Sequence, residues 1–523
     1  MWLYPEIRTL SDYPRYHGRV HADKPALVHN GRTTTFGDLD RISNQIGNAL
    51  IAQDVAPQGR VLYLGKNSDC FFYAMFGAVK ARACFVPLNW RLSIAELAVV
   101  IADSCGTFAF VDEEFVETWR KLSQGSAAPI PFCTVSTDTR ESDLMAQWYD
   151  AHPVSDPALP GMLDDAAIQL YTSGTTGAPK GVVISNASLN HMRLCEHFET
   201  ALSWRDDDTY LFCTPNFHLV GVGLSLQLLY NGVTIVVERV FDPGHTLAAI
   251  TAHRPTILVV VPAIIQMLLD HPDIEQADFS SVRLVMYAGS PISLGLIRRA
   301  LEKMRCEFMQ FYGATETSGA VTLLRPDQHD LSQEANLKSC GTPLSLISVR
   351  IVDDTGQEVP AGIPGELLVR SPALAAGYWQ MQDATDAAFQ NGWYRTGDVA
   401  YRDATGLYYI YDRAKDMIVS GGENIYSAEI ESVLSTHPSV RAVAVIGIPD
   451  PKWGEAVKAC IVLHPGAAAD ANDILRFGRE KLAGYKVPKS VDFMDAFPLT
   501  GSGKISKKDL RARYWSGQDR AVG

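Results

Sequence analysis

The sequence has no apolar run long enough to cross a membrane, and it has no excess of basic residues. Its most apolar stretch, residues 257–269, is interrupted by Pro262 and is far shorter than the ~20 apolar residues that a membrane helix needs. Acidic residues outnumber basic ones, 59 to 46, which gives a net charge of −13. Nucleic-acid scaffolds usually carry a basic stripe, so this balance argues against one. It does not exclude a small anionic ligand in a local basic site.

Cysteine is also scarce, and its positions form no metal-binding or redox motif. The nine cysteines are scattered, their number is odd and no CxxC pair occurs, which favours a reducing compartment. The first residues lack the basic region and apolar core of a secretory signal. We therefore expect a cytoplasmic protein without a transmembrane segment.

The length of 523 residues exceeds what one hydrophobic core organises, because single domains rarely grow beyond about 250–300 residues. Apolar β-rich runs at 233–237, 257–261 and 283–287 alternate with helical patterns at 262–270 and 294–304. Strands separated by helices predict parallel sheets with crossover helices. The fold class that we expect is α/β, in at least two domains.

The pattern changes after about residue 340. Short strand runs joined by Gly, Asp and Pro turns, at 348–359 and 365–379, predict a β-rich subdomain. The α/β pattern resumes after Lys415. We place the boundary between a large and a small region at residues 412–416.

A segment rich in glycine and hydroxyl groups, Tyr171–Gly181 (YTSGTTGAPKG), follows an expected strand at 168–171. Gly174 and Gly177 let the backbone turn tightly and approach a ligand. The Ser and Thr residues add hydroxyl donors, and Lys180 adds a positive charge. This combination predicts a phosphate-binding loop, although its spacing differs from that of the P-loop.

Four further motifs follow in order. They are YGATETSG (312–319), WYRTGD (393–398), DRAKDMIVSGGENIYSAEIE (412–431) and PLTGSGKIS (498–506). With the glycine-rich loop, this ordered set resembles the adenylate-forming superfamily, which contains acyl-CoA synthetases, luciferase and the adenylation domains of peptide synthetases. The resemblance covers nearly the whole chain and is nearest to the AMP-forming fatty acyl-CoA ligases.

The resemblance implies a fold and a reaction. The fold would be a large N-terminal domain (1–411) of two α/β subdomains and a β-barrel-like subdomain, a hinge (412–416) and a small, mobile α+β C-terminal domain (417–523). In the reaction, a carboxylate attacks the α-phosphate of Mg²⁺-ATP, which gives an acyl-adenylate and pyrophosphate. A thiol, usually that of coenzyme A, then displaces AMP. ATP, Mg²⁺ and coenzyme A are therefore the expected cofactors and co-substrates.

The same resemblance assigns nucleotide contacts residue by residue. Tyr312 would stack on adenine, Thr315 would bond the α-phosphate, and Asp398 would accept hydrogen bonds from the ribose hydroxyls. Arg413 would also face the ribose. The other expected contacts are Thr172, Ser173, Gly174, Thr175, Thr176, Gly177 and Lys180 in the loop, Gly289, Ser290 and Pro291 on the adenine side, and Gly313, Ala314 and Glu316 near Tyr312.

The resemblance also assigns the chemistry. Glu316 would hold Mg²⁺ with Thr172, since a hard cation takes oxygen ligands. Lys504 would stabilise the negative charge that builds on the α-phosphate and the carboxylate in the first step. Thr172 and Lys180 would assist at the phosphates. The remaining expected positions are Lys415 at the hinge and Gly421 and Gly422 in the thioester loop. For these residues a solvated charge or a plain turn is the alternative.

We expect the acyl pocket around NFHLVG (216–221). His218 would lie near the substrate carboxylate or gate the pocket, with a core histidine as the alternative. No acidic residue occupies this segment, which favours an uncharged acyl tail, because a buried ammonium would need a partner. Apart from His218, the candidates for the pocket lining are small or apolar. The full set is Phe217, His218, Val220, Gly221, Gly223, Leu224, Gly289, Gly313 and Gly319.

The sequence thus predicts an AMP-forming acyl-CoA ligase for a medium- or long-chain fatty acid or another hydrophobic acid. An aryl acid such as a benzoate or cinnamate is the alternative substrate. A stand-alone adenylation enzyme that loads a carrier protein in trans is the alternative activity, and a nucleotide-binding protein without chemistry is a third. The sequence does not distinguish between these acids, and it is compatible with a homodimer.

Overall fold

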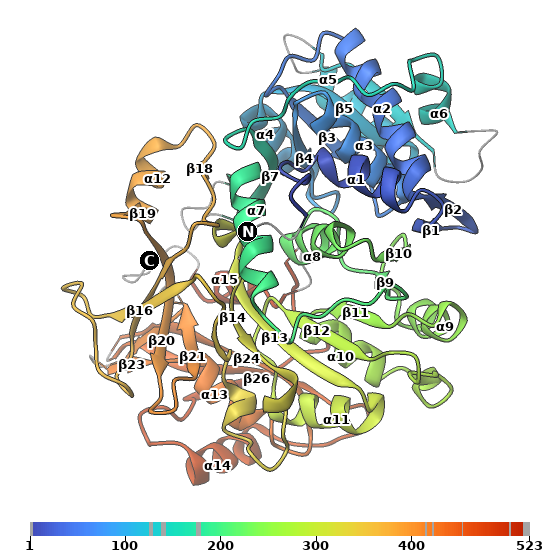
Figure 1. The fold of residues 1–523 in the computed structure, drawn as a ribbon. Helices are drawn as coiled ribbons and strands as arrows, with labels where there is room; N and C mark the ends of the chain where they lie inside the picture. Colours follow the sequence, from blue (N-terminus) through green and yellow to red (C-terminus); the bar gives the residue numbers. More distant parts are fainter. Residues whose placement is uncertain are drawn as a thin grey trace.

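The computed structural model describes residues 4–124, 129–136, 143–173, 179–413, 416–420, 423–451, 453–500 and 504–515. Figure 1 shows the arrangement: the first part of the chain (blue) lies above the second (green to yellow), the β-rich part (orange) lies beside both, and the C-terminal part (red) lies below. No helix among these residues combines the length and the apolarity that a bilayer span requires.

The first large sheet has seven strands in the order β18-β8-β7-β4-β3-β5-β6. The run from β7 to β6 is parallel, whereas β8 and β18 add antiparallel at one edge. The strands are β3 (Arg60–Leu64), β4 (Cys84–Pro87), β5 (Gly106–Asp112), β6 (Phe132–Val135), β7 (Ala166–Ser173), β8 (Pro179–Ser185) and β18 (Gly377–Tyr378). The helices of this part are α1 (Asp12–Val20), α2 (Phe36–Ala52), α3 (Asp69–Lys80), α4 (Ile94–Ser104), α5 (Val116–Gln124) and α6 (Leu144–Tyr149), with η1 (Glu113–Phe115).

The second large sheet has nine strands in the order β15-β14-β13-β12-β11-β9-β10-β1-β2. They are β1 (Pro25–His29), β2 (Arg32–Thr35), β9 (Thr209–Phe212), β10 (Thr234–Val237), β11 (Ile257–Val260), β12 (Leu284–Ala288), β13 (Glu307–Ala314), β14 (Gly319–Leu324) and β15 (Thr342–Pro343). Its helices are α7 (Asn186–His197), α8 (Leu219–Tyr230), α9 (Pro243–His253), α10 (Pro262–Leu269) and α11 (Leu294–Met304), with η2 (Pro272–Glu275), η3 (Thr315–Thr317), η4 (Pro326–Gln328) and η5 (Asn336–Lys338). The predicted strands at 233–237, 257–261 and 283–287 and the predicted helices at 262–270 and 294–304 are confirmed.

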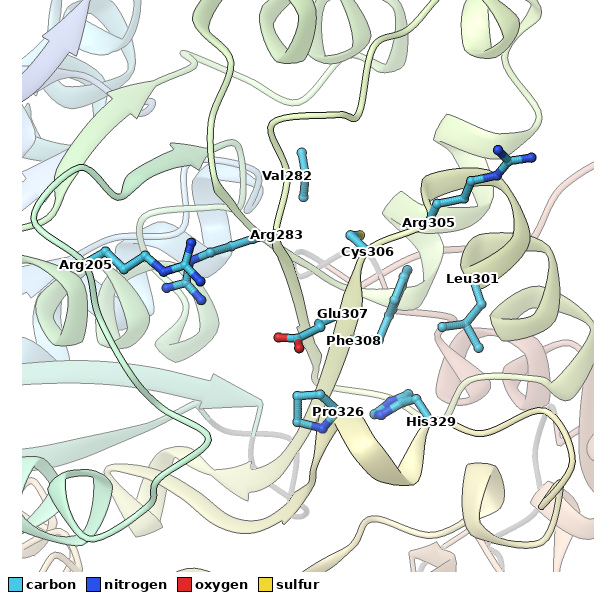
Figure 2. Close-up of a pocket in the computed structure, with 10 residues that line it drawn as sticks. All are labelled: Arg205, Val282, Arg283, Leu301, Arg305, Cys306, Glu307, Phe308, Pro326 and His329. Atoms are coloured by element: carbon cyan, nitrogen blue, oxygen red, sulfur yellow. The ribbon is translucent and has the colours of Figure 1, made fainter.

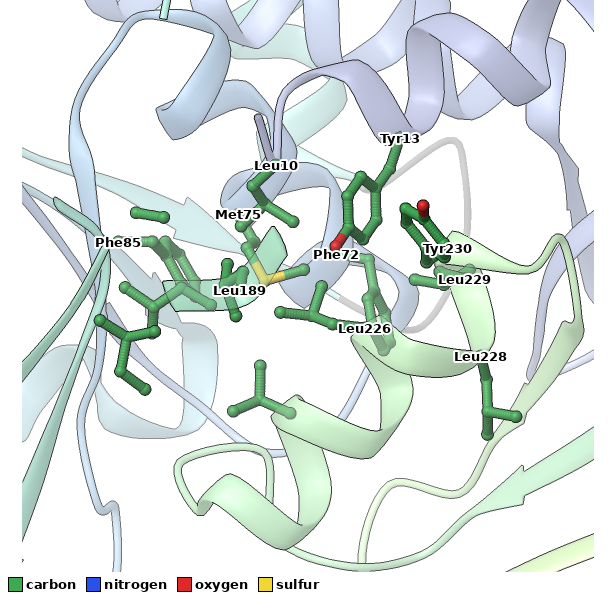
Figure 3. Close-up of a cluster of buried hydrophobic side chains, with 14 of the residues drawn as sticks. Leu10, Tyr13, Phe72, Met75, Phe85, Leu189, Leu226, Leu228, Leu229 and Tyr230 are labelled. Atoms are coloured by element: carbon green, nitrogen blue, oxygen red, sulfur yellow. The ribbon is translucent and has the colours of Figure 1, made fainter. Parts of the chain in front are cut away.

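The two large sheets share a hydrophobic core. Figure 3 shows side chains of α3, such as Phe72 and Met75, packed against Leu226 of α8, with Leu10 and Tyr13 closing the same cluster. Every residue of α3 is buried. Each large apolar side chain buried in this way stabilises the fold by about 1.5–3 kcal/mol. The shared core therefore holds the two sheets in a fixed relation.

The β-rich region forms a third, antiparallel sheet. Its strands are β16 (Ser348–Val352), β17 (Gly365–Arg370), β19 (Phe389–Gln390), β20 (Trp393–Arg402) and β21 (Tyr408–Arg413), and its helix is α12 (Gln382–Ala388). The segment 365–379 does not stay within this sheet, because its last residues form β18 and join the first sheet.

The C-terminal part has its own sheet and its own core. The strands are β22 (Ile418–Ser420), β23 (Glu423–Ile425), β24 (Val440–Asp450), β25 (Gly454–Leu463) and β26 (Ser490–Phe493), and the helices are α13 (Ser427–Leu434), α14 (Ala471–Lys481) and α15 (Lys507–Ala512). Its pairing is mostly antiparallel, with β26 parallel to β25. The fold class that was expected for the small C-terminal domain, α+β, is confirmed.

Candidate active site

The glycine-rich loop connects β7 and β8. Thr172 and Lys180 are directly opposite each other in this antiparallel pair, which places both residues at the base of the loop. The predicted contacts Gly174, Thr175, Thr176 and Gly177, like the side chain of Ser173, lie outside the described residues. The base of the loop therefore brings together two of the predicted phosphate contacts, a hydroxyl and an ammonium.

Lys180 and Glu316 both contact the side chain of Tyr378. The Lys180 Nζ lies 4.6 Å from the centroid of the Tyr378 ring. The Tyr378 hydroxyl donates a hydrogen bond to Glu316 Oε1 at 2.9 Å. Glu316 lies on η3, directly after β13, and η3 contacts β8. The structure thus places the predicted metal carboxylate beside the phosphate loop.

Tyr312 and Asp398 lie on different strands, β13 and β20, but form a direct pair. The Tyr312 hydroxyl donates to Asp398 Oδ2 at 2.6 Å, and the Asp398 residue is only 7% exposed. Burial, and then the charge of Asp398, raise the pKa of the Tyr312 phenol well above its usual value, so this hydroxyl stays protonated and donates. Asp398 pairs with Arg413 across β20 and β21, but the side chain of Arg413 is outside the described part.

The turn after β13 is held by its own polar groups. The Ala314 N–H donates to the Thr317 hydroxyl at 2.9 Å, and that hydroxyl donates back to the Ala314 carbonyl at 2.8 Å. These bonds fix the backbone on both sides of Thr315. The predicted α-phosphate contact and the metal carboxylate are therefore carried on a rigid turn.

Lys504 lies beside the end of β12 in this structure. A methyl group placed at Gly289 would lie 3.4 Å from Lys504 Cε and 3.7 Å from its Nζ. Gly289 has a φ of +91°, which L side chains rarely adopt, and Ser290 and Pro291 follow it. The backbone groups of Thr500 and Lys504 hydrogen-bond, with Thr500 N–H donating to the Lys504 carbonyl at 2.7 Å. The C-terminal part thus presents its predicted catalytic lysine to the large domain.

His218 lies at the amino end of α8 and is half-buried. Burial, followed by the charges of Lys504 and Arg91, lowers the pKa of His218 from its ordinary value to about 3. The imidazole is therefore neutral at pH 7. The charges that act on it include that of the predicted catalytic lysine.

Two of the predicted pocket glycines have a packing role. A methyl group at Gly221 would lie 2.2 Å from the Pro215 carbonyl oxygen, and one at Gly313 would lie 2.2 Å from the Gly319 carbonyl oxygen. Both positions therefore require glycine for close approach of backbone, whatever ligand is bound. Phe217 is buried, whereas Val220, Gly223 and Leu224 are half-exposed on or beside the first turns of α8.

Three residues of this region, Tyr378, Trp90 and Arg91, are not among the predicted site residues. The Trp90 ring lies edge-on to Phe217, with the ring centroids 6.4 Å apart. The Arg91 Cζ lies 4.8 Å from the Trp90 ring centroid. Trp90 and Arg91 follow β4 and lie in none of the five motifs that carry the family resemblance.

The donor set fits magnesium only when phosphate oxygens complete it. Glu316 has one carboxylate oxygen bonded to Tyr378 and a second that can face a cation, and Thr172 adds a hydroxyl on the neighbouring strand. Across the described ranges, no group of three or more His, Cys, Asp and Glu side chains could hold a metal ion. Magnesium commonly takes one or two carboxylates and otherwise phosphate or water, so this pair suits a metal that arrives with a nucleotide.

A cavity of about 500 Å³ lies away from these residues. Figure 2 shows its lining, in which Val282 and Arg283 precede β12 and Cys306, Glu307 and Phe308 lie at the start of β13. Of the predicted nucleotide contacts, Gly289 directly follows β12 and Tyr312 lies near the end of β13. The cavity is therefore at the opposite, amino-terminal edge of the sheet and takes no part in the candidate site.

Three further predicted positions, besides those of the glycine-rich loop, fall outside the described residues. They are Lys415 at the hinge and Gly421 and Gly422 in the thioester loop. The other predicted contacts gather at the carboxyl ends of β12 and β13, at the base of the β7–β8 loop and at the end of the C-terminal loop that carries Lys504. Ligand sites of open α/β sheets lie at such carboxyl ends.

Comparison with known proteins adds a family and relatives. Residues 15–379 match the AMP-binding enzyme family, and residues 429–504 match the AMP-binding enzyme C-terminal domain. A fatty acid–[acyl-carrier-protein] ligase of Streptomyces coeruleorubidus is 36% identical over 522 residues, covering 99% of each chain. A medium/long-chain-fatty-acid–CoA ligase of Mycobacterium tuberculosis is 40% identical over 526 residues, covering 96% of this chain and 90% of the relative. The crystal structure of an anthranilate CoA ligase with anthranoyl-AMP superposes with a TM-score of 0.87 and 28% identity over 98% of both chains.

Proposed function

The chain belongs to the AMP-binding enzyme family and is an AMP-forming acid–CoA ligase, and from that premise we propose that it activates a hydrophobic carboxylic acid with Mg²⁺-ATP. The observation that carries the proposal is the approach of Lys504 to Gly289 and His218. A lysine from a separately folded part reaches the end of β12, beside the predicted nucleotide contact Gly289.

In the first half-reaction, Tyr312, Thr315 and Asp398 bind and orient the adenosine and the α-phosphate. Lys180 and Thr172 hold the β- and γ-phosphates at the base of the loop. The Lys504 ammonium faces the position where the carboxylate attacks, and its charge stabilises the negative charge that develops there. Mg²⁺, held through Glu316 and Thr172, would neutralise phosphate charge. Neutral His218 can accept or donate a hydrogen bond near the substrate carboxylate.

In the second half-reaction, the coenzyme A thiol replaces AMP on the acyl group. We propose that the segment containing Gly421 and Gly422 leaves room for the thiol arm. The hinge at Lys415 then lets the C-terminal part exchange Lys504 for that segment, because a hinge residue absorbs the change in φ and ψ.

The acid that we favour is a medium- or long-chain fatty acid. Residues 216–221 contain no acidic side chain, and Phe217 packs against Trp90, so the pocket offers apolar and aromatic contact. The fatty-acid relatives support this choice. An aryl acid is the second candidate, because Trp90 and Phe217 also suit an aromatic ring and the anthranilate ligase shares the fold over its length.

A carboxylate panel tests the proposal. The enzyme would be incubated with Mg²⁺, labelled pyrophosphate, ATP and one acid at a time, and the exchange of label into ATP would be measured. We expect exchange with octanoate to palmitate, with weaker exchange for benzoate and cinnamate. No exchange with any acid would contradict an adenylate-forming activity.

The acceptor is tested in the second step. Coenzyme A and a phosphopantetheinylated carrier protein would be offered separately to the pre-formed acyl-adenylate. We expect AMP release with coenzyme A. Turnover with the carrier alone would favour the alternative that the Streptomyces relative represents. All nine cysteines are free in the structure, which supports action in a reducing compartment such as the cytoplasm.

A further inference from the structure

Tyr378 comes from the β-rich region but is fixed to the strand that carries the phosphate-loop lysine. In β18, Gly377 and Tyr378 pair with Val183 and Val182 of β8. The pairing is extended on both sides: the Ala376 N–H donates to the Val183 carbonyl at 2.8 Å, and the Trp379 N–H donates to the Gly181 carbonyl at 2.7 Å. The position of the Tyr378 ring relative to Lys180 is therefore set by backbone hydrogen bonds.

The same short segment holds Glu316 at two points. The Tyr378 hydroxyl donates to Glu316 Oε1 at 2.9 Å, and the Ala375 N–H donates to the Glu316 backbone carbonyl at 2.8 Å. Both the side chain and the backbone of the predicted metal carboxylate thus depend on residues 375–378.

Lys180 contacts the face of the same ring. Its Nζ is 4.6 Å from the ring centroid, within the range of a cation–π interaction. In the part of the chain that the structure describes, no carboxylate lies within ion-pair distance of Lys180. An aromatic face holds an ammonium in place without cancelling its charge, so the full charge stays available for a phosphate.

We propose that Tyr378 is a positioning residue for ATP: its hydroxyl aims the Glu316 carboxylate at the metal of metal–ATP, and its ring holds the Lys180 ammonium toward the phosphates. One oxygen of Glu316 is occupied by the hydroxyl, which leaves the other for the cation. This inference goes beyond the proposed function, on which it rests, and it gives the β-rich region a direct part in nucleotide binding.

The competing explanation is that Tyr378 only packs. Its ring lies 6.1 Å from that of Phe389, edge to face, so removal of the side chain would also disturb the local structure. The test therefore needs a variant that keeps the ring and a readout that packing alone would not change. Tyr378→Phe removes only the hydroxyl, whereas Tyr378→Leu removes the aromatic face as well.

Tyr409→Phe is a matched control. The Tyr409 hydroxyl donates to Asp403 Oδ2 at 3.0 Å, which is the same type of bond, at a turn of the same β-rich region and away from the candidate site. All three variants and the parent would be compared by calorimetric titration with ATP in excess Mg²⁺ and with ATP in EDTA. The apparent KM for Mg²⁺ in pyrophosphate exchange and the Tm would be measured alongside.

We expect Tyr378→Phe to weaken binding of Mg²⁺-ATP about 10-fold, as for loss of a hydrogen bond to a charged group, and to leave binding of ATP in EDTA unchanged. The apparent KM for Mg²⁺ should rise in parallel. Tyr378→Leu should weaken binding both with and without Mg²⁺, because Lys180 loses its support. Tyr409→Phe should match the parent in every nucleotide measurement.

An unchanged affinity of Tyr378→Phe for Mg²⁺-ATP, with or without a lower Tm, would overturn the inference. So would an equal loss of affinity with Mg²⁺ and in EDTA, because the hydroxyl would then not act through the metal carboxylate. The binding titrations need no carboxylic acid. A parent that binds Mg²⁺-ATP but exchanges pyrophosphate with no acid would defeat the proposed function and leave the Tyr378 result interpretable.

Discussion

The large N-terminal part and the small C-terminal part hold their site residues in different ways. The large part carries Tyr312, Asp398 and Glu316 on strands or on the turn that follows a strand, and each has a hydrogen-bond partner within that part. In the small part, Lys504 directly precedes Ile505, which forms an antiparallel bridge with Leu499. Only the contact between the two parts brings the Lys504 side chain to Gly289.

Contacts between the two parts include one ion pair and one aromatic stack. The Arg441 Nε lies 3.2 Å from Asp270 Oδ2, and the rings of Tyr411 and Tyr426 stack with centroids 4.8 Å apart. The small part has its own hydrophobic cluster, separate from the large core. In the proposed reaction, nucleotide binding would therefore depend on strands and their adjoining turns, whereas the charge for the chemical step would come from a separately folded part.

The strongest test of this division is Lys504→Ala. We expect pyrophosphate exchange to fall about 100- to 1,000-fold, since removal of one preorganised charge from a transition state has that effect. Thioester formation from supplied acyl-adenylate should be nearly unchanged. Rates of the two half-reactions would be measured separately, with Lys508→Ala as a control on the same tail. Equal losses in both half-reactions would contradict the assignment of Lys504 to the first half-reaction.

Asp398→Asn tests the large part. Because a charged acceptor contributes more to a hydrogen bond than a neutral one, we expect the Kd for ATP to rise about 10- to 100-fold. Unlike Lys504→Ala, this change should affect binding before it affects chemistry. Calorimetric titration with ATP measures it, and Glu366→Gln, which alters an exposed ion pair with Arg395 in the same sheet, is the control. An unchanged Kd would remove Asp398 from the nucleotide site.

Arg441→Gln tests the contact between the two parts. The pair with Asp270 is partly exposed, and such pairs contribute about 0.2–1 kcal/mol. We therefore expect pyrophosphate exchange to fall roughly two- to five-fold, with thioester formation from supplied acyl-adenylate unaffected. Arg476→Gln is matched to it, because Arg476 pairs with Asp473 inside the small part. A similar effect of both variants would show that the interface pair has no special role.

The smallest expected effect is a shift in a pKa. Lys504 is the second cause of the low pKa of His218, about 3, after burial, and Arg91 is the third. In Lys504→Ala the pKa of His218 should rise, but not to the ordinary value of about 6.5, because burial and Arg91 remain. NMR titration of the imidazole, assigned with His218→Gln, would follow the onset of protonation as the pH falls. An onset at the same pH as in the parent would mean that Lys504 does not approach His218 in solution.

Sequence reasoning found the residues that belong to contiguous motifs. Strands and helices such as 257–261 and 294–304 were predictable because their hydrophobic patterns are local. The assignments to Thr172, Lys180, Glu316 and Asp398 depended on motif order, and the structure brings these residues to adjoining strands and turns. Their roles remain predictions, which the variants above test.

Tyr378 and the β1–β2 hairpin show why the remaining features could not be predicted from the sequence. Tyr378 matters because β18 leaves the β-rich region and joins β8, and this long-range pairing has no local sequence signal. The same holds for β1, which pairs with β10 in the sheet that the later part of the chain builds. The sequence predicted that Gly221 and Gly313 line the acyl pocket. In the structure, each glycine lies so close to a backbone carbonyl that no larger side chain would fit.

The exchange of strands between the sheets has a consequence for how the protein is made. The His29 ring bonds to the carbonyl of Val237, 208 residues later, and the first sheet receives its edge strand only when Tyr378 has been synthesised. Neither sheet can therefore be completed while only its own half of the chain has left the ribosome. Pairings this distant fold slowly and leave strand edges exposed during translation. The large part thus matures as one cooperative unit, whereas the small part, with its own sheet and core, can fold last and independently.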